Sequence, residues 1–143
     1  MNSHHQVDQL TEGEVLAAAE ELVTAFSRTD TDAYFAAFAP DATFVFYSEA
    51  QRLESRGDYE ALWKGWLAEG WSVVRCESTN ARVQLCGTSA VFSHTVETTT
   101  QTGGVRDTTR EQETIVFARL DDGGRIVAVH EHLSLRLPAG DAA

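Results

Sequence analysis

A chain of 143 residues with 43% hydrophobic residues can close one core, and this composition argues against an intrinsically disordered protein. The formal net charge of −11 disfavours nucleic acids and anionic membranes as partners, because like charges repel. No stretch approaches the ~20 apolar residues of a membrane span, and the polar residues 1–10 lack the core of a secretory signal. We therefore expect one cytoplasmic domain that binds neither nucleic acid nor membrane.

Helices are expected in the N-terminal half. Thr11 and Glu14 have the spacing of a capping box, and apolar residues then recur on one helical face. A second short helix is expected from Asp30 or Thr31 until Pro40 stops it. The apolar positions of these two helices are Val15, Ala19, Leu22, Phe26, Tyr34, Phe35 and Phe38.

Residues 43–47 are rich in strand formers and predict a short strand. Asp58 can cap a third helix, which Gly70 would end. Its aromatic residues, Trp63 and Trp66 among them, are typical of packing positions.

From Trp71 onward the hydrophobic period changes to 2, which predicts long strands joined by glycine-containing turns. Cys76 and Cys86 fall within the first of these strands; they do not form a disulfide framework, and we expect small, buried, reduced thiols. Helices first and an antiparallel meander last predict an α+β fold: a curved sheet wrapped around helices, with a cone-shaped cavity. The expected strands are residues 71–86, 89–101, 106–120 and 125–137, within a single domain of residues 11–137 flanked by a flexible 1–10 and a frayed 138–143.

Two motifs resemble a known superfamily. The Asp41-Ala42-Thr43-Phe44 entry after Pro40 is similar to SnoaL-like proteins of the nuclear transport factor 2 (NTF2) superfamily. The C-terminal run from Glu113-Thr114 to His130-Glu131-His132-Leu133-Ser134 resembles the association domain of calcium/calmodulin-dependent protein kinase II. The resemblance implies the same α+β cone, but this superfamily includes isomerases, cyclases, dehydratases, hydrolases and assembly domains, so it implies no particular reaction.

This sequence also departs from the kinase association domain. The resemblance places apolar residues where that domain lines its pocket with arginines, so a carboxylate-binding pocket is not carried over. Those residues are Val96, Ile115 and Leu133.

His130 and His132 lie two apart on one strand and therefore share a face, where they could bind a metal. Gly124 partly matches a cupin motif, but Arg136 stands where that motif needs a glutamate. We therefore expect no metal and no cofactor. Both histidines are interpreted as hydrogen-bonded within the sheet or at a subunit contact.

Glu131 and Glu113 are the candidate catalytic groups. Glu131 alternates with apolar residues, and burial among them would raise its pKa toward the range of a general acid or base. The alternative is that Glu131 pairs with Arg119 or Arg110, or reaches solvent. Which face of the last strand lines the cavity, the one with Glu131 or the one with His130, stays open, because it depends on the length of the preceding turn.

We expect a pocket for a small apolar or mixed molecule and a homodimer formed through the open face of the sheet. The function that this predicts is a cofactor-independent acid–base enzyme of isomerase, dehydratase or hydrolase type, and the alternative is a non-catalytic assembly or ligand-binding module. The expected ligand-binding residues are Tyr34, Phe38, Tyr47, Trp63, Trp66, Val96, Ile115, Phe117 and Leu133.

Overall fold

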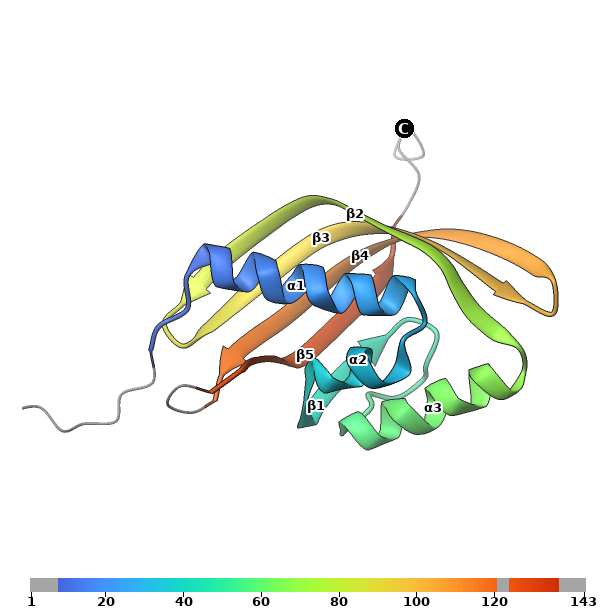
Figure 1. The fold of residues 1–143 in the computed structure, drawn as a ribbon, viewed down its shortest axis with the longest axis horizontal. Coiled ribbons are helices and arrows are strands. Elements are labelled where there is room, and N and C mark those ends of the chain that lie inside the picture. The colour runs from blue at the N-terminus through green and yellow to red at the C-terminus, as the bar shows by residue number, and fades with distance from the viewer. Residues whose placement is uncertain (1–7, 121–123, 137–143) are drawn as a thin grey trace, which may run out of the picture.

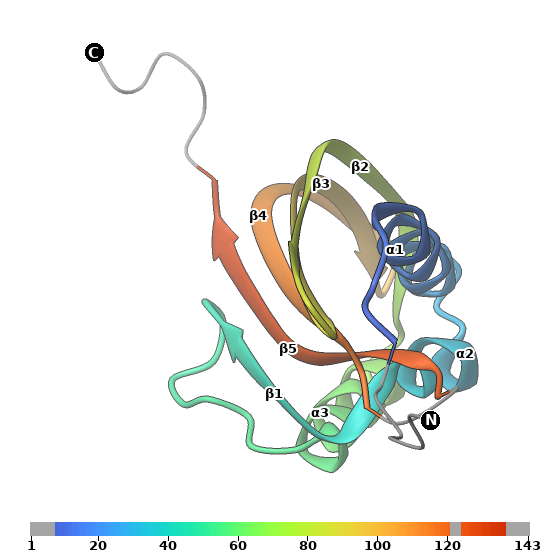
Figure 2. The same ribbon diagram turned by 90° about the vertical axis from the view of Figure 1, so that its left-hand side faces the viewer.

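The computed structural model describes residues 8–120 and 124–136, and it has the expected α+β architecture (Figure 1). Three helices lie against one face of a curved five-stranded sheet with the order β1-β5-β4-β3-β2 (Figure 2). In the described part of the chain, no helix is both long and apolar enough to cross a membrane. The elements are α1 (Glu12–Ser27), α2 (Thr31–Ala36), β1 (Phe38–Phe46), α3 (Arg56–Ala68), β2 (Trp71–Cys86), β3 (Ser89–Thr102), β4 (Val105–Arg119) and β5 (Ile126–Leu135).

The first helix begins as its sequence predicts. The Thr11 hydroxyl accepts a hydrogen bond from the Glu14 backbone N–H, and the Glu14 carboxylate accepts one from the Thr11 N–H. This capping box satisfies two amides that the helix cannot pair internally. Just before it, Leu10 is buried, and its N–H donates to the carbonyl of Gly87.

The third helix begins earlier than expected. Ser55, not Asp58, is the N-cap, and its hydroxyl accepts from the Asp58 N–H at 3.1 Å. Asp58 instead lies in the first turn, where its carboxylate accepts from the Glu54 N–H. A carboxylate in the first turn of a helix is favourable because of the helix dipole. The sequence therefore marked the start of this helix correctly, but Asp58 lies one turn after the N-cap. Gly70 ends the helix in a positive-φ conformation, as expected.

Strand β1 is longer than predicted and includes Phe38 and Pro40. Proline is tolerated there because β1 is an edge strand. β1 pairs in parallel with β5, whereas the other neighbours in the sheet are antiparallel. The last strand, β5, therefore lies beside the first, which places Thr43 next to His130 and Phe44 next to Glu131.

Bulges bend the sheet where it covers the helices. In β5 the residue Val129 is extra, because Val116 pairs with His130 and Phe117 pairs with Ala128. Ala128, and not Val127 or Val129, therefore lies opposite Phe117. A bulge of this kind bends a strand and re-aims its side chains, and Glu131 follows two residues later.

The core lies between the helices and the concave face of the sheet. It is unusually aromatic: Trp63 of α3 stacks on Tyr34 of α2 with ring centroids 5.0 Å apart, and Phe44 of β1 meets Tyr59 edge-on. Cys76 is half-buried as a strand residue, but Cys86 is exposed, contrary to expectation. Its position at the end of an edge strand leaves no element to cover it.

Candidate functional site

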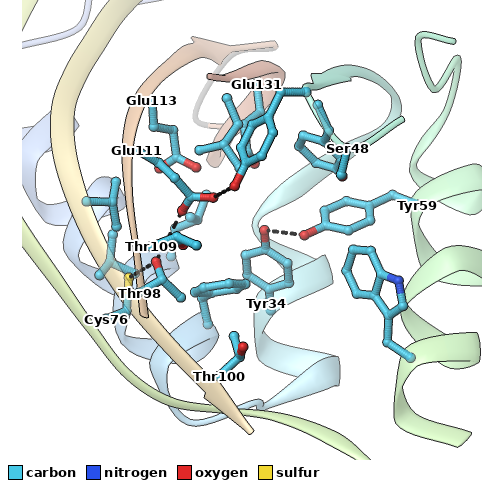
Figure 3. Close-up of a pocket in the computed structure, with 18 of the residues that line it drawn as sticks. Tyr34, Ser48, Tyr59, Cys76, Thr98, Thr100, Thr109, Glu111, Glu113 and Glu131 are labelled. Carbon is cyan, nitrogen blue, oxygen red and sulfur yellow. Dashed lines mark hydrogen bonds between the residues drawn. The ribbon is translucent and has the colours of Figure 1, made fainter. Parts of the chain in front are cut away.

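A cavity of about 260 Å³ opens between the helices and the concave face of the sheet (Figure 3). Its size is just below the ~300–1,000 Å³ typical of small-molecule sites. Aromatic rings from the helices, together with Phe46, Tyr47 and Trp71, form one wall. The inner faces of β3, β4 and β5 form the other. The lining residues include Leu22, Phe26, Tyr34, Phe46, Tyr47, Tyr59, Trp66, Trp71, Cys76, Val96, Thr98, Thr100, Glu111, Glu113, Glu131 and Leu133.

The register of β4 and β5 resolves which face of the last strand points inward. Ile115, which is fully buried, pairs with Glu131, so both side chains lie on the concave face. His132 pairs with Thr114 on the opposite, convex face. The cavity is therefore lined by the Glu131 and Leu133 face.

Glu131 is a buried carboxyl group among apolar and acidic neighbours. Its Oε1 atom is buried and has no hydrogen-bond partner among the residues described. Burial raises the pKa of Glu131 well above its ordinary value, and the nearby charge of Glu113 raises it further. Of the two carboxyl groups, Glu131 is therefore the one that keeps its proton more readily.

The arginines that were considered as partners of Glu131 bind elsewhere. Arg119 donates to Glu14 at 2.6 Å, and Arg110 pairs with Glu97 at 3.4 Å on an exposed surface. The alternative of a salt bridge from Glu131 to Arg119 or Arg110 is therefore wrong.

Glu113 has the opposite character. Burial alone would raise the pKa of Glu113, but the hydrogen bond from His94 and the attraction of His94 act in the opposite direction, and the pKa falls below its ordinary value. His94 Nε2 lies 2.6 Å from Glu113 Oε1, and His94 Nδ1 lies 2.5 Å from the Ser78 hydroxyl. The pKa values of the two carboxyl groups are thus shifted apart, upward for Glu131 and downward for Glu113.

A third carboxyl group, Glu111, also lines the cavity. Burial raises its pKa, while a hydrogen bond from the Tyr47 hydroxyl at 2.6 Å acts in the opposite direction. The Thr98 hydroxyl donates to the other oxygen of Glu111 at 3.3 Å. Cys76 lies beside Thr98, and burial raises the pKa of its thiol to about 12, so this thiol is not an activated nucleophile.

Two tyrosines from different helices meet opposite the carboxyl pair. The hydroxyl oxygens of Tyr34 in α2 and Tyr59 in α3 are 2.9 Å apart (Figure 3). Burial raises the pKa of both phenols, and the negative charge of Glu113 adds to this effect. Both phenols therefore stay neutral, and one of the two hydroxyls keeps its proton available for a ligand.

The structure separates the expected ligand-binding residues into two groups. Tyr34, Tyr47, Trp66, Val96 and Leu133 line the cavity, together with both candidate glutamates. The other four are buried in the core and do not line it, because they lie deeper between the helices and the sheet. These four are Phe38, Trp63, Ile115 and Phe117.

Sequence reasoning missed His94, Glu111 and Tyr59. Period 2 could have placed His94 on the face of Phe92 and Val96, and Glu111 on the face of Glu113. What this pattern lacks is the partner of each group, because the partner comes from another strand.

His130 and His132 lie outside the cavity. The Nδ1 atom of His130 is 2.8 Å from the Thr43 hydroxyl, a hydrogen bond within the sheet. Burial and the neighbouring His132 lower the pKa of His130. Within residues 8–120 and 124–136, no three His, Cys, Asp or Glu side chains are grouped so that they could hold a metal ion.

Comparison with known proteins identifies the family. The profile of the SnoaL-like domain family matches residues 15–138. The chain belongs to this family. None of the curated proteins matches the sequence.

Solved structures share this fold at low sequence identity. An NTF2-like protein from Rhodospirillum rubrum has 18% identity and a TM-score of 0.74, over 86% of this chain and 98% of its own. A ketosteroid isomerase-like protein from Erwinia carotovora atroseptica has 18% identity and a TM-score of 0.73, over 90% and 100%. A putative calcium/calmodulin-dependent protein kinase II association domain from Xanthomonas campestris has 18% identity and a TM-score of 0.68, over 96% and 99%. The predicted NTF2-like fold and its likeness to the association-domain type are confirmed.

Proposed function

We propose that this protein binds a small, largely apolar molecule in its cavity and acts on it by general acid catalysis without a cofactor. The observation that carries this proposal is the buried carboxyl group of Glu131, which faces the cavity with Oε1 free of any described partner. A carboxylic acid held neutral can donate a hydrogen bond or a proton to a ligand oxygen at neutral pH.

The lining of the cavity defines the ligand class. No lysine or arginine is among the described lining residues, while three carboxyl groups are. A carboxylate or phosphate ligand would be repelled, and aromatic rings such as Trp66 and Trp71 favour an apolar body. The expected ligand is a neutral ring or short chain with one carbonyl, ether or hydroxyl oxygen placed toward Glu131.

The arrangement supports an isomerase, dehydratase or hydrolase type of reaction. In each of these reactions an acid that protonates or hydrogen-bonds the ligand oxygen stabilises the charge that develops there. The neutral phenols of Tyr34 and Tyr59 add one more donor, because one of the two hydroxyls donates to the other.

Binding can be tested with matched probes, because Trp66 and Trp71 line the cavity and report on its contents through their fluorescence. Cyclohexanone should change this emission in a saturable way, and cyclohexanecarboxylate should not. Any molecule that co-purifies should be identified by native mass spectrometry.

Turnover of the co-purified molecule by wild type, with at least a tenfold loss in Glu131→Gln, would support catalysis. Binding without turnover would instead favour the ligand-binding module. Preferential binding of the carboxylate probe would contradict the assignment of ligand class.

We also propose a homodimer formed through the convex face of the sheet. No described helix covers this face, which carries half-buried residues such as Val91, Val116 and His130. A solved relative described as an association domain supports self-association in this fold. Light scattering at micromolar concentration should give about twice the monomer mass of 15.7 kDa, and a monomer mass would contradict the proposal.

A cytoplasmic location remains part of the proposal. It is supported by the free thiols of Cys76 and Cys86, because an exposed thiol such as that of Cys86 persists in a reducing compartment. Fluorescence microscopy of a tagged full-length chain tests it, and export from the cytoplasm would overturn it.

A further inference from the structure

Hydrogen-bonded side chains on three neighbouring strands lead to the cavity wall. They are Ser78 on β2, His94 on β3 and Glu113 on β4, and Glu131 on β5 lines the cavity together with Glu113. Ser78 is exposed on the edge strand, whereas His94 is fully buried and Glu131 nearly so. The general acid proposed above therefore rests on a polar network that lies mostly in the protein interior.

We infer that His94 is a positioning residue that makes Glu113 the ionised member of the carboxyl pair and so leaves the proton on Glu131. This inference rests on the proposed function, because it explains how the acid is kept in its working form. His94 does not line the cavity, so it would act through Glu113 and not on a ligand.

The geometry at His94 supports this role. An ionised Glu113 can only accept hydrogen bonds, so the 2.6 Å contact requires a proton on His94 Nε2. His94 Nδ1 then faces the Ser78 hydroxyl at 2.5 Å, and a hydroxyl can donate or accept as the ring requires. Both ring nitrogens are thereby occupied, which fixes the orientation of the imidazole.

Glu113 and Glu131 need a third group to determine which of the two ionises. Two buried carboxyl groups in contact do not both ionise, and they share one proton. Glu131 Oε1 has no hydrogen-bond partner among the described residues, while Glu113 accepts a hydrogen bond from Nε2–H of His94. The extra donor favours negative charge on Glu113.

Other titratable groups near the pair do not provide this preference. Glu111 on β4 carries a like charge, and Cys76 on β2 and the phenols of Tyr34 and Tyr59 are held neutral by burial. The described lining of the cavity contains no lysine or arginine. Of the described groups near Glu113, His94 is the one that donates an N–H hydrogen bond to it.

The experiment is a carboxyl-carbon NMR titration of ¹³C-labelled full-length protein, with the signals assigned by Glu113→Gln and Glu131→Gln. In wild type at neutral pH, the Glu131 carbon should have the shift of an acid and the Glu113 carbon that of a carboxylate. In His94→Phe, the titration midpoint of Glu113 should rise by about one pH unit or more, a tenfold change in its acid dissociation constant.

Two further variants keep the test decisive. His94→Gln preserves one N–H donor and should shift Glu113 in the same direction by less, so it carries the test if His94→Phe does not fold. His132→Gln is the matched control, because it changes an exposed histidine on the convex face of β5. It should leave both signals unchanged.

The outcomes separate this inference from the proposed function. If Glu131 is ionised in wild type at neutral pH, both the general-acid function and the role of His94 are refuted. If Glu131 is protonated in wild type but the Glu113 titration is the same in all His94 variants, the function stands and the role of His94 is refuted. An equal shift in His132→Gln would also refute it.

Discussion

Replacing Glu131 by glutamine tests the buried acid through the pH dependence of stability. Glutamine keeps the shape of the side chain and one N–H donor toward Glu113, but it cannot ionise. The wild-type carboxyl group has a raised pKa in the folded state, so folding becomes less favourable as the pH rises above the ordinary glutamate value. The variant lacks this loss, because its side chain stays neutral in both states.

The size of the effect follows from linkage. While Glu131 stays protonated in the fold, wild type should lose about 1.4 kcal/mol of unfolding free energy per pH unit above ~4.5 relative to the variant. A Glu131 that is still protonated in the fold at pH 7 gives a difference of about 3 kcal/mol in favour of Glu131→Gln. For a chain of 143 residues the unfolding entropy is about 0.3 kcal/mol per kelvin, so the melting temperatures should differ by about 10 °C.

The assay is a series of thermal or urea unfolding curves of both proteins from pH 4.5 to 8. Glu20→Gln, which removes an exposed carboxylate from α1, is the matched control and should track wild type at every pH. A constant difference between wild type and Glu131→Gln across this range would refute a raised pKa. A variant that is less stable than wild type at neutral pH would indicate that Glu131 is ionised and paired.

Three other predictions follow from the structure. Glu113→Gln should destabilise the fold at neutral pH by about 2 kcal/mol, the usual loss for a charged hydrogen bond. Since the folded-state pKa of Glu113 is lowered, the unfolding free energies of variant and wild type should become equal as the pH falls below ~4.5. An equal difference in unfolding free energy in urea melts at pH 3.5 and pH 7 would contradict this. Trp63→Ala should lower the unfolding free energy by about 3–5 kcal/mol because Trp63 is buried in the core. Trp66→Ala, at the half-buried cavity wall, should lower it clearly less and should weaken cyclohexanone binding. Equal losses of unfolding free energy in the two variants would show that the two sites were misassigned. Elemental analysis of protein purified without chelator or nickel resin should find less than one metal per chain, because no described residue joins His130 and His132 as a third ligand. One equivalent of zinc, iron or manganese would overturn that expectation.

The sequence by itself determined the elements and their order. Capping at Thr11 and Glu14, the stop at Gly70 and the change of period at Trp71 are local signals, and each of them has its counterpart in the structure. Such signals depend on hydrogen bonds and side-chain spacing within a few residues. The glutamates were found for the same reason, because alternation along one strand marks a carboxyl group among apolar neighbours.

Only the tertiary structure decided how these elements combine into a site. The pairing of Ile115 with Glu131 turned the glutamate inward, a choice that the sequence had left open, and the bulge at Val129 put Ala128 instead of Val127 on the same face as Glu131. His94 became a partner of Glu113 only when β3 and β4 paired in register. A one-residue change in register moves every side chain to the other face of a sheet, so pairing between distant strands, which no local pattern encodes, determines which groups meet in the cavity.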